Sequence, residues 1–276
     1  MSCRVFYILL VLFMGSAASA QQDTSFRLLR IMNGDMESFT VDNLDNVYVL
    51  TSRNQVKKYN AAGDSVAVFN DIRKYGRATL IDVSNPLKVL LYYRDFATVL
   101  MLDRFLNVVH VLDLRKQGVY QAGAIGQSFD NRVWVYDEME ARLKKLDENG
   151  TVSLQTPDFR MLFTQPFSPQ KIFDEDRCVY LYDPRRGIYV FDYFGALKNG
   201  IQIMGWKDLR VGGNHIYGTE ADTLRRYDIR SFRVDSWLLP EPARGSLSFR
   251  FSGTRVYALK PGCRDTGNCL YIYLLR

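Results

Sequence analysis

Histidine is almost missing from this chain, and so are the short motifs that mark most enzyme families. Only His110 and His215 occur among 276 residues, whereas a zinc or iron site commonly needs three or more convergent ligands. No G-x-S-x-G, P-loop or G-x-G-x-x-G motif is present. The acidic clusters Asp42–Asn46 and Asp174–Asp176 are expected to cap turns rather than bind calcium. We therefore expect no catalytic residue, no metal ion and no cofactor.

Long apolar stretches are also absent, except at the very start. Arg4 precedes the apolar run Val5–Met14, and Ser16–Ala20 ends in an A-x-A-like cleavage site. This arrangement is typical of a secretory signal peptide, and the run is too short to span a membrane. We expect residues 1–20 to be removed during export and residues 21–276 to form one domain without a transmembrane span.

Cysteine is scarce, and three of the four cysteines lie beyond the predicted signal peptide. Cys263 and Cys269 flank a short polar loop, and an exported chain meets an oxidising compartment. We expect these two residues to form a disulfide across a hairpin. Metal binding is the weaker alternative, because no histidine or third cysteine is near. Cys178 lies in a strand-like run and is expected to be a buried, unreactive thiol.

A strong excess of one charge is lacking as well. The chain has 36 basic and 30 acidic residues, a net charge of +6, which falls to +5 when Arg4 is removed with the signal peptide. Such a balance suits an acidic partner surface or an anionic envelope without specifying either. Export and the even spread of basic residues disfavour nucleic acid as a partner.

What the chain does contain is an internal repeat. A turn, a short apolar strand, a gap and a second strand recur six times, most clearly as Asp176–Leu181 followed by Ile188–Asp192. Successive copies are spaced by 42, 44, 46, 37 and 40 residues, measured between β-branched residues of the first strand. These anchor residues are Val47, Val89, Val133, Val179, Ile216 and Val256. Four strands with their turns need about 40–50 residues, which is the period of propeller blades.

The repeat predicts an all-β, six-bladed β-propeller. Each copy is preceded by one more strand-like run and followed by turn residues and a fourth strand. The predicted blades span roughly residues 38–70, 79–113, 122–157, 170–205, 206–240 and 245–276. The last copy lacks an outer strand, and residues 25–32 offer a spare one that would close the ring and remove two exposed edges. An open six-unit array or a sandwich is the alternative.

The recurring pattern D-x-x-x-x-V-Y-V…K-K/R-Y/L-D…G resembles the NHL-like repeat of six-bladed propellers among exported Gram-negative envelope proteins. The resemblance covers nearly all of residues 25–276. It implies the propeller fold and a location in the periplasm or at the periplasmic face of the outer membrane. Some similar propellers are scaffolds in envelope machinery, and others are enzymes.

The connections between blades are the most informative loops. Asp71–Gly76 and Asp113–Gly118 are near copies 42 residues apart, so they occupy equivalent sites on adjacent blades, and Pro157–Phe167 is the longest connection. All such connections share one face of a propeller, and loops held by a rigid scaffold often carry function. The residues expected to contact a partner are the cations and aromatics of this face: Arg73, Lys74, Tyr75, Arg115, Lys116, Phe159, Arg160, Phe163, Trp206 and Lys207.

In this hypothesis the cations steer a partner and the aromatic rings anchor it. The alternative for Phe159, Leu162 and Phe163 is that they fold back and plug the axial channel. We interpret the sequence as a non-enzymatic, protein-binding scaffold or accessory subunit of an envelope complex, for example at the outer membrane. A hydrolase, lyase or carbohydrate-binding propeller that uses the axial pocket is the second hypothesis.

Overall fold

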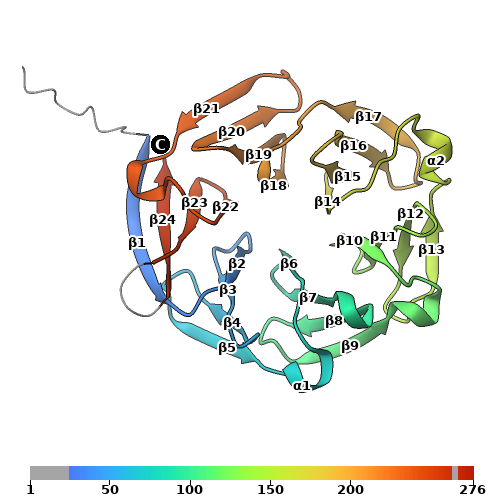
Figure 1. The fold of residues 1–276 in the computed structure, drawn as a ribbon, viewed down its shortest axis with the longest axis horizontal. Coiled ribbons are helices and arrows are strands. Elements are labelled where there is room, and N and C mark those ends of the chain that lie inside the picture. Colours follow the sequence, from blue (N-terminus) through green and yellow to red (C-terminus); the bar gives the residue numbers. More distant parts are fainter. Residues whose placement is uncertain (1–24, 263–266) are drawn as a thin grey trace, which may run out of the picture.

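Six four-stranded antiparallel sheets surround a central axis (Figure 1). The computed structural model describes residues 25–262 and 267–276. The predicted signal peptide, residues 1–20, and Cys263 lie outside this part of the chain. The six-bladed propeller predicted from the repeat is confirmed.

Within blades 1 to 5 the strands follow chain order from the axis to the rim. Blade 1 contains β2 (Ser38–Val41), β3 (Val47–Leu50), β4 (Val56–Tyr59) and β5 (Ser65–Phe69). Blade 2 contains β6 (Leu80–Asn85), β7 (Lys88–Tyr93), β8 (Thr98–Asp103) and β9 (Val108–Asp113). Blade 3 contains β10 (Ala122–Gln127), β11 (Val133–Asp137), β12 (Arg142–Leu146) and β13 (Val152–Gln155). Blades 4 and 5 contain β14 (Lys171–Glu175), β15 (Cys178–Asp183), β16 (Gly187–Asp192), β17 (Leu197–Ile201); and β18 (Lys207–Gly212), β19 (His215–Glu220), β20 (Thr223–Asp228), β21 (Val234–Leu238). Blade 6 contains β22 (Ser248–Ser252), β23 (Arg255–Lys260), β24 (Asn268–Leu275) and, at the rim, β1 (Phe26–Gly34).

The second strand of each blade forms the core. Both faces of such a strand pack against neighbouring blades, so the strand is apolar at consecutive positions and not only at alternate ones. All six residues of β15 are buried, and so are all five of β11. Each anchor residue of the repeat is buried in one of these strands. The repeat is thus visible in the sequence because each blade needs one doubly buried strand.

The N-terminal strand closes the ring as predicted. β1 pairs antiparallel with β24, from Phe26 opposite Leu275 to Gly34 opposite Asn268. Near the axis, the Ser252 hydroxyl of blade 6 donates to the Asp42 carbonyl of blade 1 at 3.1 Å. Both contacts hold the first and last parts of the chain together.

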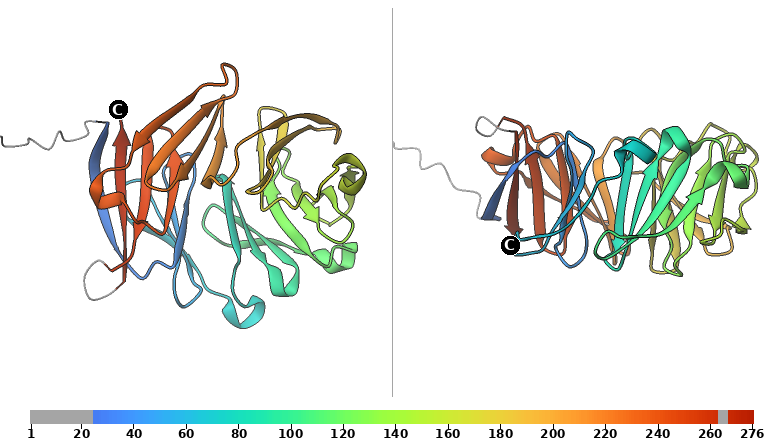
Figure 2. Two further views of the ribbon diagram at one scale, coloured as in Figure 1. Left: turned by 45° about the horizontal axis from the view of Figure 1, so that its top comes forward. Right: turned by 90° about the horizontal axis from the view of Figure 1, so that it is seen from below.

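Short helices occur in the connections between blades. They are α1 (Ile72–Tyr75), η2 (Leu114–Gln117), α2 (Phe159–Leu162) and η3 (Glu241–Ala243), and η1 (Arg94–Phe96) joins two strands within blade 2. Because the strands alternate in direction, every inter-blade connection lies on the same face as the hairpins between second and third strands. We call this the loop face, from which α1 projects in the side view (Figure 2). The turn face is the opposite one, which carries the remaining hairpin turns.

Aspartates shape many of the turns. On the turn face, Asp103 Oδ1 accepts hydrogen bonds from the backbone N–H groups of Phe105 and Asn107, both at 2.8 Å. Asp192 Oδ1 likewise accepts from Phe194 and Ala196, both at 2.9 Å. Such Asx turns hold the backbone and direct the residue two positions after the aspartate outward. Phe105 and Phe194 are exposed for this reason.

Both described cysteines, Cys178 and Cys269, are buried. Cys178 is buried, as predicted. Cys269 Sγ lies 2.9 Å from Asn33 Oδ1 of the neighbouring strand β1. Because Cys263 is not among the described residues, the Cys263–Cys269 disulfide stays a prediction. No helix in the described ranges is long and apolar enough to cross a membrane.

Candidate partner-binding face

The aromatic residues expected on the loop face lie in the interior instead. Tyr75, Phe159 and Trp206 are buried, and Phe163 is half-buried. The Phe159 side chain is only 2 % exposed and stacks on Phe191, with ring centroids 5.3 Å apart and an interplanar angle of 11°. The expectation that these rings are exposed anchors for a partner is therefore corrected.

The local backbone explains this burial. Asp158 caps α2 by accepting a hydrogen bond from Arg160 N at 2.8 Å. The single helical turn then directs Phe159 into the core between blades 3 and 4, while Arg160 faces solvent. α2 lies at the outer rim of the ring (Figure 1). Its rings therefore pack between blades and do not plug the axial channel, so that alternative is wrong as well.

The cations of the same connections are exposed. They are Arg73, Lys74, Arg115, Lys116, Arg160 and Lys207. Arg160 forms an ion pair with Asp158, with Nη2 and Oδ2 2.6 Å apart. Within the part of the chain that the structure describes, the other five have no carboxylate within ion-pair distance. The loop face therefore carries positive charge that its own acidic residues do not pair.

Two of the connections have the same structure, as their sequences suggest. Residues 71–76 and 113–118 each form one helical turn that starts at an aspartate and ends at a glycine, Gly76 or Gly118. These glycines have φ of 73° and 76°, a left-handed conformation that ends a helix without a Cβ clash. Tyr75 of the first turn and Leu114 of the second are buried, and both turns expose a basic pair. The cations consequently occupy equivalent positions on adjacent blades.

The environment keeps Lys74 charged. Its Nζ lies 4.8 Å from the centroid of the Tyr75 ring. Interaction with the Tyr75 side chain, assisted by Asp71, raises the pKa of Lys74 above its ordinary value. The lysine is therefore fully protonated at neutral pH.

Exposed apolar residues on the loop face escaped the sequence analysis. Met161 of α2 is 84 % exposed, and Met139 and Phe96 are exposed on hairpins of the same face. Met139 follows the Asx rule of the turns, since Asp137 Oδ1 accepts a hydrogen bond from Met139 N at 3.0 Å. The sequence signal that could have identified it is an aspartate two positions before an apolar residue in a turn. Flexible methionines beside cations suit a protein interface.

The innermost strands bring charged groups together near the axis. Arg250 of β22 forms an ion pair with Asp208 of β18, with Nη1 and Oδ1 2.8 Å apart. On β14, burial and the nearby positive charge of Arg250 lower the pKa of Lys171 to about 8. No group of three or more histidine, cysteine, aspartate or glutamate side chains suited to a metal ion occurs among the described residues. His110 and His215 lie 3.4 Å from Glu148 and Asp228, respectively.

Comparisons with known proteins support the fold alone. No protein-family model matches the chain, and no curated protein matches its sequence. A streptogramin B lyase structure superposes with a TM-score of 0.59 at 11% identity, over 93% of this chain and 90% of that one. The Pan2 WD40 domain of Neurospora crassa superposes with a TM-score of 0.58 at 10% identity, over 92% of this chain and 96% of that one. A protein of Bacteroides fragilis described as a putative exported protein superposes with a TM-score of 0.57 at 9% identity, over 92% of this chain and 96% of that one. These neighbours include both an enzyme and a domain of the WD40 class.

Proposed function

We propose that this chain is an exported, non-enzymatic propeller that binds an acidic protein partner through its loop face. The observation that carries the proposal is the group of exposed cations without a carboxylate partner on two adjacent connections, Arg73, Lys74, Arg115 and Lys116, together with Lys207 at the start of β18 on the same face. Their charge would attract an acidic surface from a distance, and the exposed methionine Met161 would supply apolar contact after docking. The partner would be an envelope protein, and the chain its scaffold or accessory subunit.

The proposed location is the periplasm or the periplasmic face of the outer membrane. The signal-peptide pattern of residues 1–20 supports export. The similarity to a Bacteroides fragilis protein described as exported agrees with it. The NHL-like sequence pattern adds the outer-membrane context to the proposal.

The test is to identify the proteins that co-purify with the native chain from its envelope, and then to remove the charge. In the variant R73Q/K74Q/R115Q/K116Q we expect the amount of co-purified partner to fall at least tenfold. The thermal unfolding temperature should barely change, because each substitution is on the surface. The wild-type association rate should also fall as salt rises, since exposed charges are screened over about 8 Å at physiological ionic strength.

A matched control removes the same charge elsewhere. The variant R27Q/R104Q/R230Q/R233Q changes four exposed arginines of the rim and the turn face, and it should retain the partner. Equal loss in both variants would mean that only net charge matters. Full retention in the loop-face variant would refute the proposed interface.

The second candidate function, an enzyme or ligand-binding propeller with an axial site, has one observation in its favour. Lys171 is a half-buried amine on an innermost strand with a lowered pKa, and such amines are often functional. The only carboxylate described close to it, that of Asp208, is already paired with Arg250. The loop face therefore remains the better supported site.

A further inference from the structure

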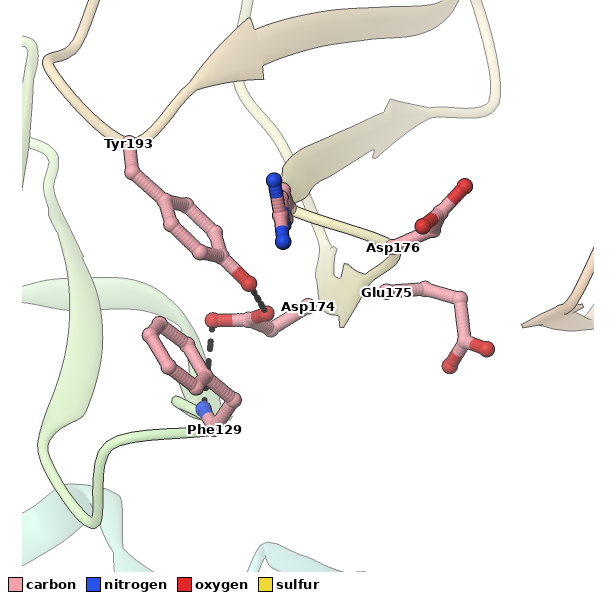
Figure 3. Close-up of a pocket in the computed structure, with 6 residues that line it drawn as sticks. Phe129, Asp174, Glu175, Asp176 and Tyr193 are labelled. Atoms are coloured by element: carbon pink, nitrogen blue, oxygen red, sulfur yellow. Dashed lines mark hydrogen bonds between the residues drawn. The ribbon is translucent and has the colours of Figure 1, made fainter.

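A pocket of about 410 Å³ opens on the turn face, between blades 3 and 4. It lies on the face opposite the proposed partner-binding cations. Its lining consists of two aromatic rings, three carboxylates and one guanidinium: Phe129, Tyr193, Asp174, Glu175, Asp176 and Arg177. Figure 3 shows the rings along one side and the carboxylates of Glu175 and Asp176 along the other.

The aromatic side of the pocket is a rigid, exposed platform. Phe129 is 67 % exposed, yet its ring stacks on Tyr193 with centroids 4.8 Å apart and an interplanar angle of 4°. The Tyr193 hydroxyl in turn donates a hydrogen bond to Asp174 (Figure 3). Burial and this hydrogen bond raise the pKa of Tyr193, so the hydroxyl keeps its proton. One face of the Phe129 ring is therefore covered by protein and the other is free for a ligand.

Asp174 fixes the platform from below. Besides Tyr193, it accepts hydrogen bonds from Ser128 Oγ and from Trp134 Nε1, both at 2.8 Å. Its oxygens are therefore occupied, and Asp174 acts as a support and not as a ligand-binding group. A binding surface that is already ordered loses little entropy when a ligand arrives.

The lysine behind the platform argues against a cationic ligand. Lys145 Nζ lies 4.8 to 5.3 Å from the ring centroids of Trp134, Tyr193 and Phe129 and forms an ion pair with Asp130 at 2.8 Å. The electron-rich faces of these rings thus already stabilise an ammonium group of the protein. The rings are therefore less available to a second cation, and Arg177 adds a positive charge beside them.

The remaining lining residues offer free hydrogen-bonding groups of both kinds. Among the described residues, the guanidinium of Arg177 and the carboxylate of Asp176 have no hydrogen-bond or ion-pair partner. Glu175 uses Oε1 to accept from Gly213 N at 3.0 Å, which leaves Oε2 available. Donors and acceptors therefore stand beside an apolar surface, which is the usual composition of a small-molecule site.

We propose that this pocket binds a neutral saccharide. The C–H face of a pyranose ring would pack on the free face of Phe129, while its hydroxyls accept from Arg177 and donate to Asp176 and Glu175. A hydroxyl both donates and accepts, so a sugar satisfies both kinds of group without leaving a buried charge unpaired. The three carboxylates would repel an anionic ligand.

The experiment titrates the purified protein with neutral oligosaccharides, namely tetramers of β-1,4-linked glucose, β-1,4-linked N-acetylglucosamine, α-1,4-linked glucose and β-1,4-linked xylose. The readout is calorimetry together with the indole N–H resonance of Trp134, which reports on Asp174 directly beneath the platform. At least one tetramer should bind and shift that resonance. Phe129→Ala should weaken this binding at least tenfold, and Asp176→Asn or Arg177→Gln several-fold.

Phe194→Ala is the matched control. Phe194 is an exposed phenylalanine, 88 % accessible, on a turn adjacent to Tyr193 but outside the pocket lining, so its removal should leave the affinity unchanged. Absence of binding by all four tetramers at millimolar concentration would overturn the proposal. Binding of choline or spermidine in their place, or equal weakening by Phe129→Ala and Phe194→Ala, would also overturn it. None of these results depends on the loop-face partner.

Discussion

Three lysines of the third strands are buried, and each has a different partner. Lys144 pairs with Asp137 at 2.8 Å, Lys145 with Asp130 and three aromatic rings, and Lys58 donates to the Arg104 carbonyl at 2.8 Å. Burial disfavours an ammonium group, so each of these contacts offsets a desolvation cost. Lys171 on β14 has no such partner among the described residues, and the pKa of this lysine is lowered to about 8 instead.

Lys171 should therefore make stability depend on pH in a defined window. Between pH 8 and about 10.5 the unfolded chain keeps this proton while the folded protein has lost it. The unfolded state then binds more protons, so stability rises with pH in that window. Replacing Lys171 by Met should increase the free energy of unfolding at pH 7, by up to about 3 kcal/mol, and this gain should vanish towards pH 10.5.

The measurement is denaturant unfolding of wild type and K171M from pH 7 to 10.5. Lys207→Met, which removes an exposed lysine one blade away, should show no such window. A K171M difference that stays constant with pH, or that grows above pH 8, would contradict the lowered pKa.

At the scale of elements, the single turn of α2 carries one side chain that packs in the core, Phe159, and one that is exposed on the surface, Met161. Phe159 packs against Tyr136, Phe163, Phe167 and Phe191, whereas Met161 faces solvent. Phe159→Ala should lower the free energy of unfolding by about 3–5 kcal/mol, the usual cost of a large cavity. Met161→Ala should change it by less than about 0.5 kcal/mol.

Binding should follow the opposite order. The protein that remains folded as F159A should retain its loop-face partner, while M161A should release it faster. Denaturant unfolding and dissociation kinetics measured on the same samples test both statements. A small stability loss in F159A, together with lost binding, would restore Phe159 to the interface.

Comparison of the strands with the short helices shows what the sequence could and could not predict. Anchors such as Val47 and Val133 predicted the blades, because doubly buried strands require apolar residues at a regular spacing. The exposure of Arg73 and Arg115 was also predictable, since charges stay in water. The burial of Phe159 was not predictable, because a shift of one residue within a single helical turn changes which side chain faces inward. The cluster of aromatic rings around Lys145 could not be predicted either, since Phe129, Trp134 and Tyr193 come from separate strands and turns.

At the scale of the whole molecule, the ring depends on the pairing of β1 with β24. Deleting residues 21–32 should expose the edge of β24 and cause aggregation, because an unpaired edge strand is a template for other chains. Deleting only residues 21–24, which precede β1, is the control and should leave the protein monomeric. Light scattering and thermal unfolding measure both effects. A monomeric protein of unchanged stability after the longer deletion would contradict the role of β1 in closure.

The pairing of β1 with β24 also constrains the order of folding. Arg276 N donates to the Ser25 carbonyl at 2.8 Å, so β1 finds its partner only after β24, at the other end of the propeller sequence, has also left the ribosome. Contacts between such distant parts of a chain form slowly. Until then β1 is free to pair with β24 of another copy, and domain-swapped dimers are the characteristic error of this architecture. A chain of this design would therefore fold more reliably if β1 were shielded until the last blade has formed.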